Sequence, residues 1–275
     1  MSDIVGSRRP NLIHLTIIVT YATRTFMDKS KTSNNSNSYD VESKVEGFHW
    51  WFVVRRKLLK SILLSVNVPI NSLTLDIGCG TGSNLSALVS TRLHVIGLDR
   101  SVYALHFVRR KGGFPLLAGD LSYLPIKTRS VGLIIAMDIF EHLEEDAEGI
   151  FESHRVLNKG GILILTVPAF RFLWGIQDVV TGHKKRYSKK EITNKLKEAG
   201  FEIFKSSYFN FFLFFPILIA RRLMHLLGLT IRSENEVNFP LLNFFLKTIF
   251  SMEPHVLKYF SFPFGVSIYC IAKKS

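Results

Sequence analysis

The sequence is poor in cysteine. Its 275 residues contain only Cys79 and Cys270. Two distant cysteines provide neither the disulfide framework of a small secreted domain nor the paired spacing of a zinc site. We therefore expect no structural disulfide, no metal centre and a reducing compartment, the cytoplasm.

Acidic residues are also scarce relative to basic ones. The chain has 35 Lys and Arg against 22 Asp and Glu, a formal net charge of +13. From Arg171 onward there are 16 basic and 7 acidic residues, and this part is also rich in Phe. Basic residues that flank apolar helices favour an anionic membrane surface over nucleic acid as a partner. The sequence does not indicate an oligomeric state.

Near the N-terminus there is no apolar run long enough to span a bilayer. Residues 12–22 follow Arg8 and Arg9 as in a signal peptide, but Thr and His interrupt them and no cleavage pattern follows. Residues 28–44 have the composition of a solvated tail. We expect residues 1–44 to be disordered or to include sequence upstream of the true start, with Met27 as the candidate initiator.

From residue 48 onward, apolar segments of strand length alternate with segments of helix length. An amphipathic helix with a basic face is expected first, ending before Pro69. Strands are expected at 73–77, 93–98, 115–118, 131–137, 162–167, 201–209 and 265–272. Helices are expected at 83–90, 102–111, 144–158 and 189–199, and a basic loop at 171–187. Continuously apolar strands separated by helices predict an α/β fold, a doubly wound, mostly parallel, Rossmann-like sheet.

Three glycines, Gly78, Gly80 and Gly82, follow the first predicted strand at alternate positions. Ligands of parallel sheets bind at the carboxyl ends of the strands, so this loop is expected to contact one. A P-loop is excluded because no Lys follows the last glycine. A dinucleotide loop fits poorly, because the carboxylate of Asp76 would repel a pyrophosphate. The loop is suited instead to a cationic ligand.

Two further acids end the next two predicted strands. Asp99 lies 19 residues after Gly80, where a carboxylate can accept hydrogen bonds from both ribose hydroxyls. Asp120 can bind an adenine amino group while Leu121 contacts the ring. Each acid alone could equally be a turn residue or a helix cap. Together they predict a nucleoside with a cationic, unphosphorylated tail, which describes S-adenosylmethionine.

Five segments in order, 75–82, 97–99, 119–125, 137–143 and 157–163, resemble the class I S-adenosylmethionine-dependent methyltransferases, in particular the type 11 or ubiquinone-biosynthesis-like branch. The resemblance covers about residues 48–208 and returns at 265–273, so we assign the domain to 45–208 and 265–275. It implies seven strands, the last antiparallel. It also implies that the cofactor contacts Asp76, Gly78, Cys79, Gly80, Gly82, Asp99, Asp120, Leu121 and Met137.

Two histidines are candidates for removing a proton from an acceptor hydroxyl, a task suited to a neutral imidazole. His142 follows the fourth predicted strand, although it could equally pack at the start of the next helix. His183 lies in the segment 182–188, which resembles the Gly-His-x-x-Arg-Tyr-Ser signature of methyltransferases associated with polysaccharide biosynthesis. The same subgroup suggests Trp174, Arg186 and Tyr187 as acceptor-binding residues.

Residues 209–264 separate the last two predicted strands and are rich in Phe, Leu and Ile. Residues 209–229 nearly reach the length of a membrane span, but Pro216, Arg221 and His225 interrupt them. We expect a hydrophobic helical insertion that covers the acceptor pocket, lies in a membrane interface or simply packs on the core.

The sequence thus predicts an S-adenosylmethionine-dependent methyltransferase that acts on oxygen of a saccharide or of a lipid-linked small acceptor, peripheral to the inner face of a membrane. A quinone-type ring is a second acceptor class. A Rossmann oxidoreductase and a non-catalytic cofactor-binding partner of a glycosyltransferase are alternatives. A nucleic-acid methyltransferase is disfavoured, because no Asn-Pro-Pro-Tyr-like motif follows the fourth strand at Met137.

Overall fold

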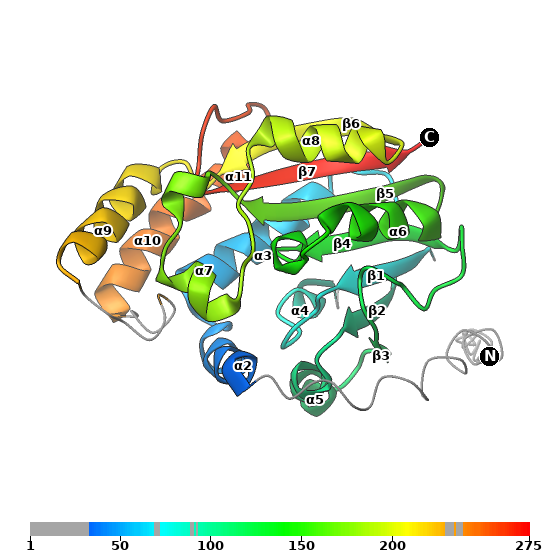
Figure 1. The fold of residues 1–275 in the computed structure, drawn as a ribbon, viewed down its shortest axis with the longest axis horizontal. Coiled ribbons are helices and arrows are strands. Elements are labelled where there is room, and N and C mark those ends of the chain that lie inside the picture. Colours follow the sequence, from blue (N-terminus) through cyan, green and yellow to red (C-terminus); the bar gives the residue numbers. More distant parts are fainter. Residues whose placement is uncertain (1–32, 69–71, 89–90, 92, 229–233, 235–238) are drawn as a thin grey trace, which may run out of the picture.

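A seven-stranded sheet runs through the part of the chain that the computed structural model describes, residues 33–68, 72–88, 91, 93–228, 234 and 239–275 (Figure 1). The strand order is β3-β2-β1-β4-β5-β7-β6. The strands are β1 (Leu73–Ile77), β2 (His94–Asp99), β3 (Leu116–Ala118), β4 (Val131–Met137), β5 (Leu157–Pro168), β6 (Phe201–Phe209) and β7 (Ser267–Lys274). Strand β7 runs antiparallel to both of its neighbours, β5 and β6, and the other described strand pairs are parallel. The predicted fold class is confirmed.

Helices cover both faces of the sheet. In Figure 1, α6 (Asp146–Val156) and α8 (Lys189–Glu198) lie in front of the sheet, and α3 (Trp50–Leu63) lies behind it. Helix α3 packs against α4 (Leu85–Leu88) and α10 (Pro240–Ser251), whereas α5 (Val102–Lys111) packs against β2 and β3. The buried residues Val54, Leu58 and Ile62 recur every four positions in α3, as expected for one apolar face.

This two-sided cover restricts where polar chemistry can lie. Every residue of β4 is buried, and most of β5 is buried as well. A sheet that is apolar on both faces can present charged groups only at its ends and in its loops. The carboxyl ends of the parallel strands are therefore the place where a polar site can form.

Between β6 and β7 the chain forms α9 (Phe214–Leu226), α10 and α11 (Glu253–Val256), in the segment predicted to be a helical insertion. The buried side chain of Glu253 accepts a hydrogen bond of 3.0 Å from the Phe212 backbone N–H. Asn243 of α10 accepts one of 2.7 Å from the Trp50 N–H at the start of α3. The first bond joins the two ends of the insertion, and the second attaches the insertion to α3.

The structure differs from the sequence predictions in several elements. Helix α2 (Ser33–Val45) occupies part of the predicted disordered tail, because distant partners such as Tyr103 hold it: the Tyr103 hydroxyl donates to Asp40 at 2.9 Å. Helix α7 (Ile176–Thr181) and the 3₁₀ turn η2 (Arg171–Leu173) lie in the predicted loop. Strand β5 begins earlier than predicted, because Leu157 pairs with Val131. The predictions for residues 1–32, including the start at Met27, lie outside the described residues.

Gly265 provides a test of the packing between β7 and β6. A Cβ atom at this position would lie 2.3 Å from the carbonyl oxygen of Phe209, so the two backbones would have to separate. We expect Gly265→Ala to destabilise the protein by about 1–3 kcal/mol, the usual range for overpacking. Thermal unfolding measures the change, and Gly47→Ala is the control because nothing lies within 4 Å of its Cβ position. Equal melting temperatures for the two variants would contradict this packing.

Candidate active site

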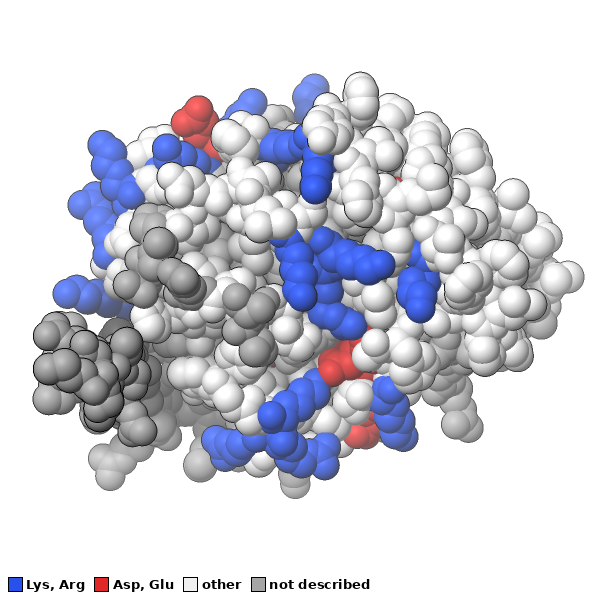
Figure 2. Space-filling view, turned by 180° about the vertical axis from the view of Figure 1, so that it is seen from behind, with Lys and Arg blue, Asp and Glu red and all other residues white. Residues whose placement is uncertain are grey.

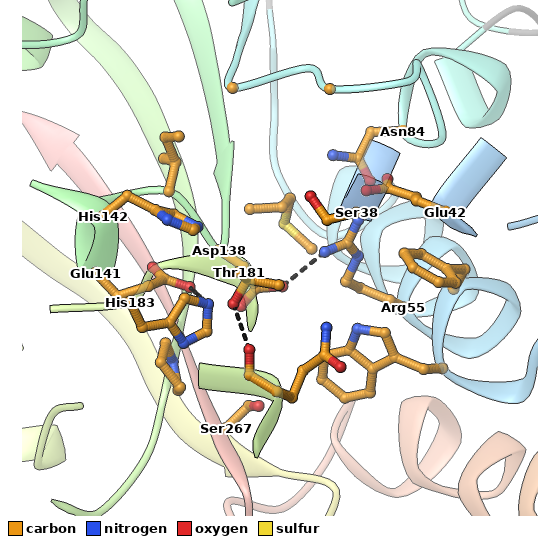
Figure 3. Close-up of a pocket in the computed structure, with 18 of the residues that line it drawn as sticks. Ser38, Glu42, Arg55, Asn84, Asp138, Glu141, His142, Thr181, His183 and Ser267 are labelled. Carbon is orange, nitrogen blue, oxygen red and sulfur yellow. Dashed lines mark hydrogen bonds and ion pairs between the residues drawn. The ribbon is translucent and has the colours of Figure 1, made fainter. Parts of the chain in front are cut away.

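A cavity of about 300 Å³ lies at the carboxyl ends of β1, β2 and β4. Figure 3 shows part of its lining, with Arg55 and Glu42 on one side and Glu141, His142 and His183 on the other. The predicted cofactor residues that line the cavity are Gly78, Cys79, Gly80, Asp99, Asp120, Leu121 and Met137. The fold thus brings together side chains from three separate strand ends, as predicted.

The glycine loop is shaped by the positive φ angles of Gly78 and Gly80, 68° and 53°. A Cβ on Gly78 would lie 2.6 Å from the side chain of Ile139, so this position has no room for a side chain. The N–H of Gly80 donates a hydrogen bond of 2.9 Å to the carboxylate of Asp99. Both positions favour glycine, since other residues adopt this conformation less often. Gly82 belongs to the same loop but does not line the cavity.

Asp76 does not line the cavity but lies buried beside the loop. Neither of its carboxylate oxygens has a hydrogen-bond partner among the described residues. Burial raises its pKa from 3.8 to about 7. A buried carboxylate without a partner favours a cation nearby, because charges interact over several ångströms in a low-dielectric interior. Asp76 can therefore attract the positive tail of S-adenosylmethionine from behind the glycine loop. In this geometry it does not make the direct contact with the cofactor that was predicted.

Asp99 and Asp120 both face the cavity from the ends of β2 and β3. The second oxygen of Asp99 accepts a hydrogen bond of 2.8 Å from the Ser101 N–H, and burial raises the pKa of this carboxyl. Asp120 accepts one of 2.8 Å from the Ser122 N–H. Each acid therefore orders its own loop and also contributes to the cavity wall. The turn and binding interpretations of these residues do not exclude each other.

Helix α2 covers the cofactor end of the cavity and was missed by the sequence analysis. Tyr39 and Glu42 line the cavity. The Glu42 carboxylate accepts a hydrogen bond of 3.2 Å from the hydroxyl of Thr81 in the glycine loop. An ion pair between Glu46, which follows the helix, and Lys111 attaches α2 to α5. The absence of Gly and Pro from 33–46 was the available signal for a helix.

An ion pair forms part of the wall between the two ends of the cavity. Arg55 of α3 donates to Asp138 at 2.7 Å (Figure 3). Asp138 directly follows β4 with a φ of 57°, and its other oxygen accepts a hydrogen bond of 3.0 Å from Thr166. Sequence reasoning missed both residues, because Arg55 and Asp138 are 83 positions apart.

The opposite end of the cavity holds three titratable side chains, Glu141 and His142 of the 3₁₀ turn η1 (Phe140–His142) and His183, which follows α7. The imidazole rings of His142 and His183 meet edge to face, with centroids 4.8 Å apart. Burial, with the charges of His183 and Arg100, lowers the pKa of His142 to about 3. His142 is therefore neutral at pH 7. The structure brings together the two histidines that the sequence predicted for catalysis.

Asp178 of α7 holds His183 and Arg186 in place. Its carboxylate lies 2.8 Å from Nδ1 of His183 and accepts hydrogen bonds of 2.8 and 2.9 Å from Arg186. Burial alone would raise the pKa of Asp178, but these partners lower it to about 2. Arg186 lines the cavity, yet its guanidinium is committed to Asp178 and to the Ala169 carbonyl oxygen. The sequence analysis missed Asp178 because it predicted a loop where α7 forms.

Two predicted acceptor-binding residues lie away from the cavity. The side chain of Tyr187 is fully buried, and its hydroxyl donates a hydrogen bond of 2.8 Å to Asp146. Trp174 is 40% exposed and does not line the cavity. Tyr187 therefore fastens the segment after α7 to α6, and this packing role replaces its predicted contact with the acceptor.

Asp76 allows the electrostatic character of the cavity to be tested. The pKa of Asp76 is about 7 in the folded protein and 3.8 in the unfolded chain. Its charge therefore destabilises the ligand-free fold by the full amount above about pH 7, and it has no effect below about pH 4. We expect Asp76→Asn to raise the melting temperature at pH 8 and to raise it less at pH 5. The same variant should bind S-adenosylmethionine about 10 to 100 times more weakly at pH 8, because a nearby negative charge is lost.

Differential scanning fluorimetry and isothermal titration calorimetry measure these two effects. Glu198→Gln, at an exposed position at the end of α8, is the matched control for loss of a carboxylate. Unchanged affinity of Asp76→Asn for S-adenosylmethionine would refute the electrostatic role of this residue.

Comparisons with known proteins agree with this geometry. Residues 75–165 match the family described as a methyltransferase domain. A "probable S-adenosylmethionine-dependent methyltransferase" of Mycolicibacterium smegmatis is 30% identical over 132 residues, which are 47% of this chain and 51% of that protein. The chain spans about half the length of the curated relatives it matches.

Solved structures show the same fold at low identity. A chain from the complex of the Haloferax volcanii Trm112 methyltransferase activator with a methyltransferase superposes with a TM-score of 0.60 at 19% identity, over 88% of this chain and 97% of that one. Phosphoethanolamine N-methyltransferase 2 of Haemonchus contortus, in complex with S-adenosyl-L-methionine, superposes with a TM-score of 0.53 at 17% identity, over 79% of this chain and 52% of that one. Residues 75–165 thus match a methyltransferase domain, and the solved structures share the fold of this chain.

Proposed function

We propose that the chain transfers a methyl group from S-adenosylmethionine to an oxygen atom of a saccharide or of a lipid-linked small acceptor. Asp99, Asp120 and the loop at Gly78 and Gly80 would hold the cofactor, with the charge of Asp76 behind them. The bound cofactor supplies a methyl group on a sulfonium, which a nucleophile displaces in one step. The protein mainly has to orient the acceptor and exclude water.

The acceptor end of the cavity supports a polar acceptor. Besides the three titratable residues, its lining includes Gln177, Thr181, Asn210 and Ser267, with Trp50, Trp51 and Phe52 nearby. Hydroxyl-rich ligands are well matched by such a combination of amide and hydroxyl groups with aromatic surfaces. A quinone-type ring offers fewer hydrogen-bonding groups to such a lining than a saccharide does, so we rank it second.

The pairing of Asp178 with His183 is the observation that carries the proposal of an oxygen acceptor. Asp178 is ionised and can only accept hydrogen bonds, so a neutral His183 carries its proton on Nδ1. The lone pair is then on Nε2, the atom that can take the proton of an acceptor hydroxyl. Arg186 and the Gly175 N–H, at 2.7 Å, hold the Asp178 carboxylate in position. The imidazole is thus oriented before an acceptor binds.

His183→Ala tests this role. We expect turnover of a hydroxyl acceptor to fall by about 10²- to 10⁴-fold, the usual contribution of a positioned base, with unchanged affinity for S-adenosylmethionine. Incorporation of a labelled methyl group into glycan and lipid extracts measures turnover, and calorimetry measures affinity. His106→Ala, an exposed histidine of α5, is the control. Full turnover in His183→Ala would remove the residue from the chemistry.

The two rival functions predict other outcomes of these assays. An oxidoreductase would bind a nicotinamide dinucleotide, whose pyrophosphate would be repelled by the negative charge of ionised Asp76. A non-catalytic partner of a glycosyltransferase would bind S-adenosylmethionine but would label no glycan or lipid in any extract.

A lipid-linked acceptor is supported by the apolar end of the molecule. Helices α9 and α10 expose Phe215, Ile219, Leu223, Leu226, Leu241, Leu242, Phe244, Phe245 and Ile249. Figure 2 shows this end, at the right, without charged side chains on the face in view, next to a cluster of Lys and Arg. The described acids between β6 and β7 are Glu234, which pairs with Arg221, and the buried Glu253. Apolar side chains beside basic ones suit the interface of an anionic membrane.

Ile217 and Arg221 of α9 also line the cavity, so the same helix borders the acceptor end and presents apolar side chains to the outside. None of the described helices combines the length and the apolar character that crossing a membrane requires. We propose that α9 and α10 lie in the membrane interface and bring the cavity close to a lipid-linked acceptor.

Vesicle co-sedimentation tests this contact. The intact chain should co-sediment with anionic vesicles and much less with neutral ones. The double variant Phe215→Glu and Leu241→Glu should bind at least tenfold more weakly, because burial of each side chain contributes about 1.5–3 kcal/mol. Phe151→Glu, which changes an exposed Phe of α6, is the control. Equal binding of the double variant and the control would contradict the role of α9 and α10.

A further inference from the structure

We propose that Glu141, His142 and His183 bind a divalent metal ion at the acceptor end of the cavity. The sequence analysis predicted no metal site, because it considered cysteine spacing and because α6, β5 and α7 separate His183 from the other two residues. The fold brings one potential ligand atom from each of them within 4.8 Å of the others. Figure 3 shows the three side chains together at one side of the cavity.

The ligand atoms of the three residues would coordinate an ion after moving slightly closer together. Nε2 of His183 lies 3.7 Å from Oε1 of Glu141. Zinc binds nitrogen and oxygen at about 2.0–2.2 Å, which places tetrahedral ligand atoms about 3.4 Å from each other. An ion at the centre of the cluster would therefore require side-chain movements of about 1 Å or less.

Glu141 is the independent observation that points to a cation. Its side chain is fully buried, and neither carboxylate oxygen has a hydrogen-bond partner among the described residues. Asp138 adds further negative charge, whereas the guanidinium of Arg186, which also acts on Glu141, is paired with Asp178. A buried carboxylate that lacks a partner is costly unless it is protonated or meets a cation. A metal ion would satisfy it directly.

The surroundings of His183 resemble those of a metal ligand. Metal-binding histidines usually donate their second N–H to a carboxylate, which orients the ring and fixes the tautomer. Asp178 provides this carboxylate at 2.8 Å from Nδ1, so Nε2 is left for the ion.

The ligand set indicates the kind of ion. Two imidazoles and one carboxylate suit zinc, iron(II) or manganese(II), whereas calcium and magnesium prefer sites made of oxygen ligands. Three protein ligands leave at least one coordination position open to the cavity.

An ion in this position would also activate the acceptor hydroxyl. This step rests on the proposed function. With the ion bound, Nε2 of His183 is a ligand, and the ion lowers the pKa of the acceptor hydroxyl in place of a base. The hydroxyl proton then leaves to solvent, and the resulting oxyanion forms the bond to the methyl carbon as the bond from carbon to sulfur breaks. Binding of the ion itself does not depend on this step.

Calorimetry with zinc chloride on chelator-treated, dialysed protein tests the site. Wild-type protein should bind one zinc ion per chain. Glu141→Gln and His142→Ala should each bind at least tenfold more weakly, and Asp178→Asn about 10 to 100 times more weakly, as expected for loss of a carboxylate that orients a ligand. Glu144→Gln, an exposed neighbour, should bind like wild type.

Cobalt(II) gives an optical readout of the same site. Visible absorption of cobalt bound by nitrogen and oxygen ligands should develop in wild type and be lost in His142→Ala. Absence of stoichiometric zinc binding, or equal affinity in Glu141→Gln, His142→Ala and Glu144→Gln, would overturn the proposal.

Titration of the metal-free protein with S-adenosylmethionine separates this inference from the proposed function. If the cofactor binds and a hydroxyl acceptor is methylated without any zinc binding, the metal site is wrong and the proposed function stands. If zinc binds at the three residues and no hydroxyl acceptor is methylated, the metal site stands and the proposed acceptor is wrong.

Discussion

Negative charge without a partner at the carboxyl edge of the sheet is the constraint on which the rest of the site depends. The strands are apolar and covered by helices on both faces, so acids are confined to the strand ends and the loops that follow them. Asp76 and Glu141 are buried there without hydrogen-bond partners among the described residues. A bound cation beside either one would favour its charged form. Asp76 lies at the cofactor end and Glu141 at the acceptor end, so one principle accounts for both ends of the cavity.

Asp178 organises the acceptor end. One carboxylate holds the imidazole of His183, the guanidinium of Arg186 and the N–H of Gly175. The Gly-His-x-x-Arg-Tyr-Ser segment therefore has a largely structural role. The hydroxyl of Tyr187 donates a hydrogen bond to Asp146, whereas Nε2 of His183 faces Glu141. This arrangement explains how a segment rich in charge can be buried, and why the orientation of one imidazole requires several residues.

The sheet and the cofactor end could be predicted from the sequence, because their signals are local. The strand at 73–77 and the glycines after it lie within ten residues, Asp99 ends β2, and Asp120 follows β3 by two residues. The acceptor end depends on contacts between distant segments. Asp138 meets Arg55 across 83 positions, and Asp178 belongs to a helix too short to show a periodic pattern. Helix α2 is held by polar contacts that composition does not reveal.

The central claim is that this cavity selects a nucleoside with a positive tail over one with phosphates. The most direct measurement is calorimetric titration of the intact chain with S-adenosylmethionine and with a nicotinamide dinucleotide, under the same buffer conditions. The account predicts saturable binding of S-adenosylmethionine and no heat from the dinucleotide. Tight binding of the dinucleotide with no response to S-adenosylmethionine would contradict it.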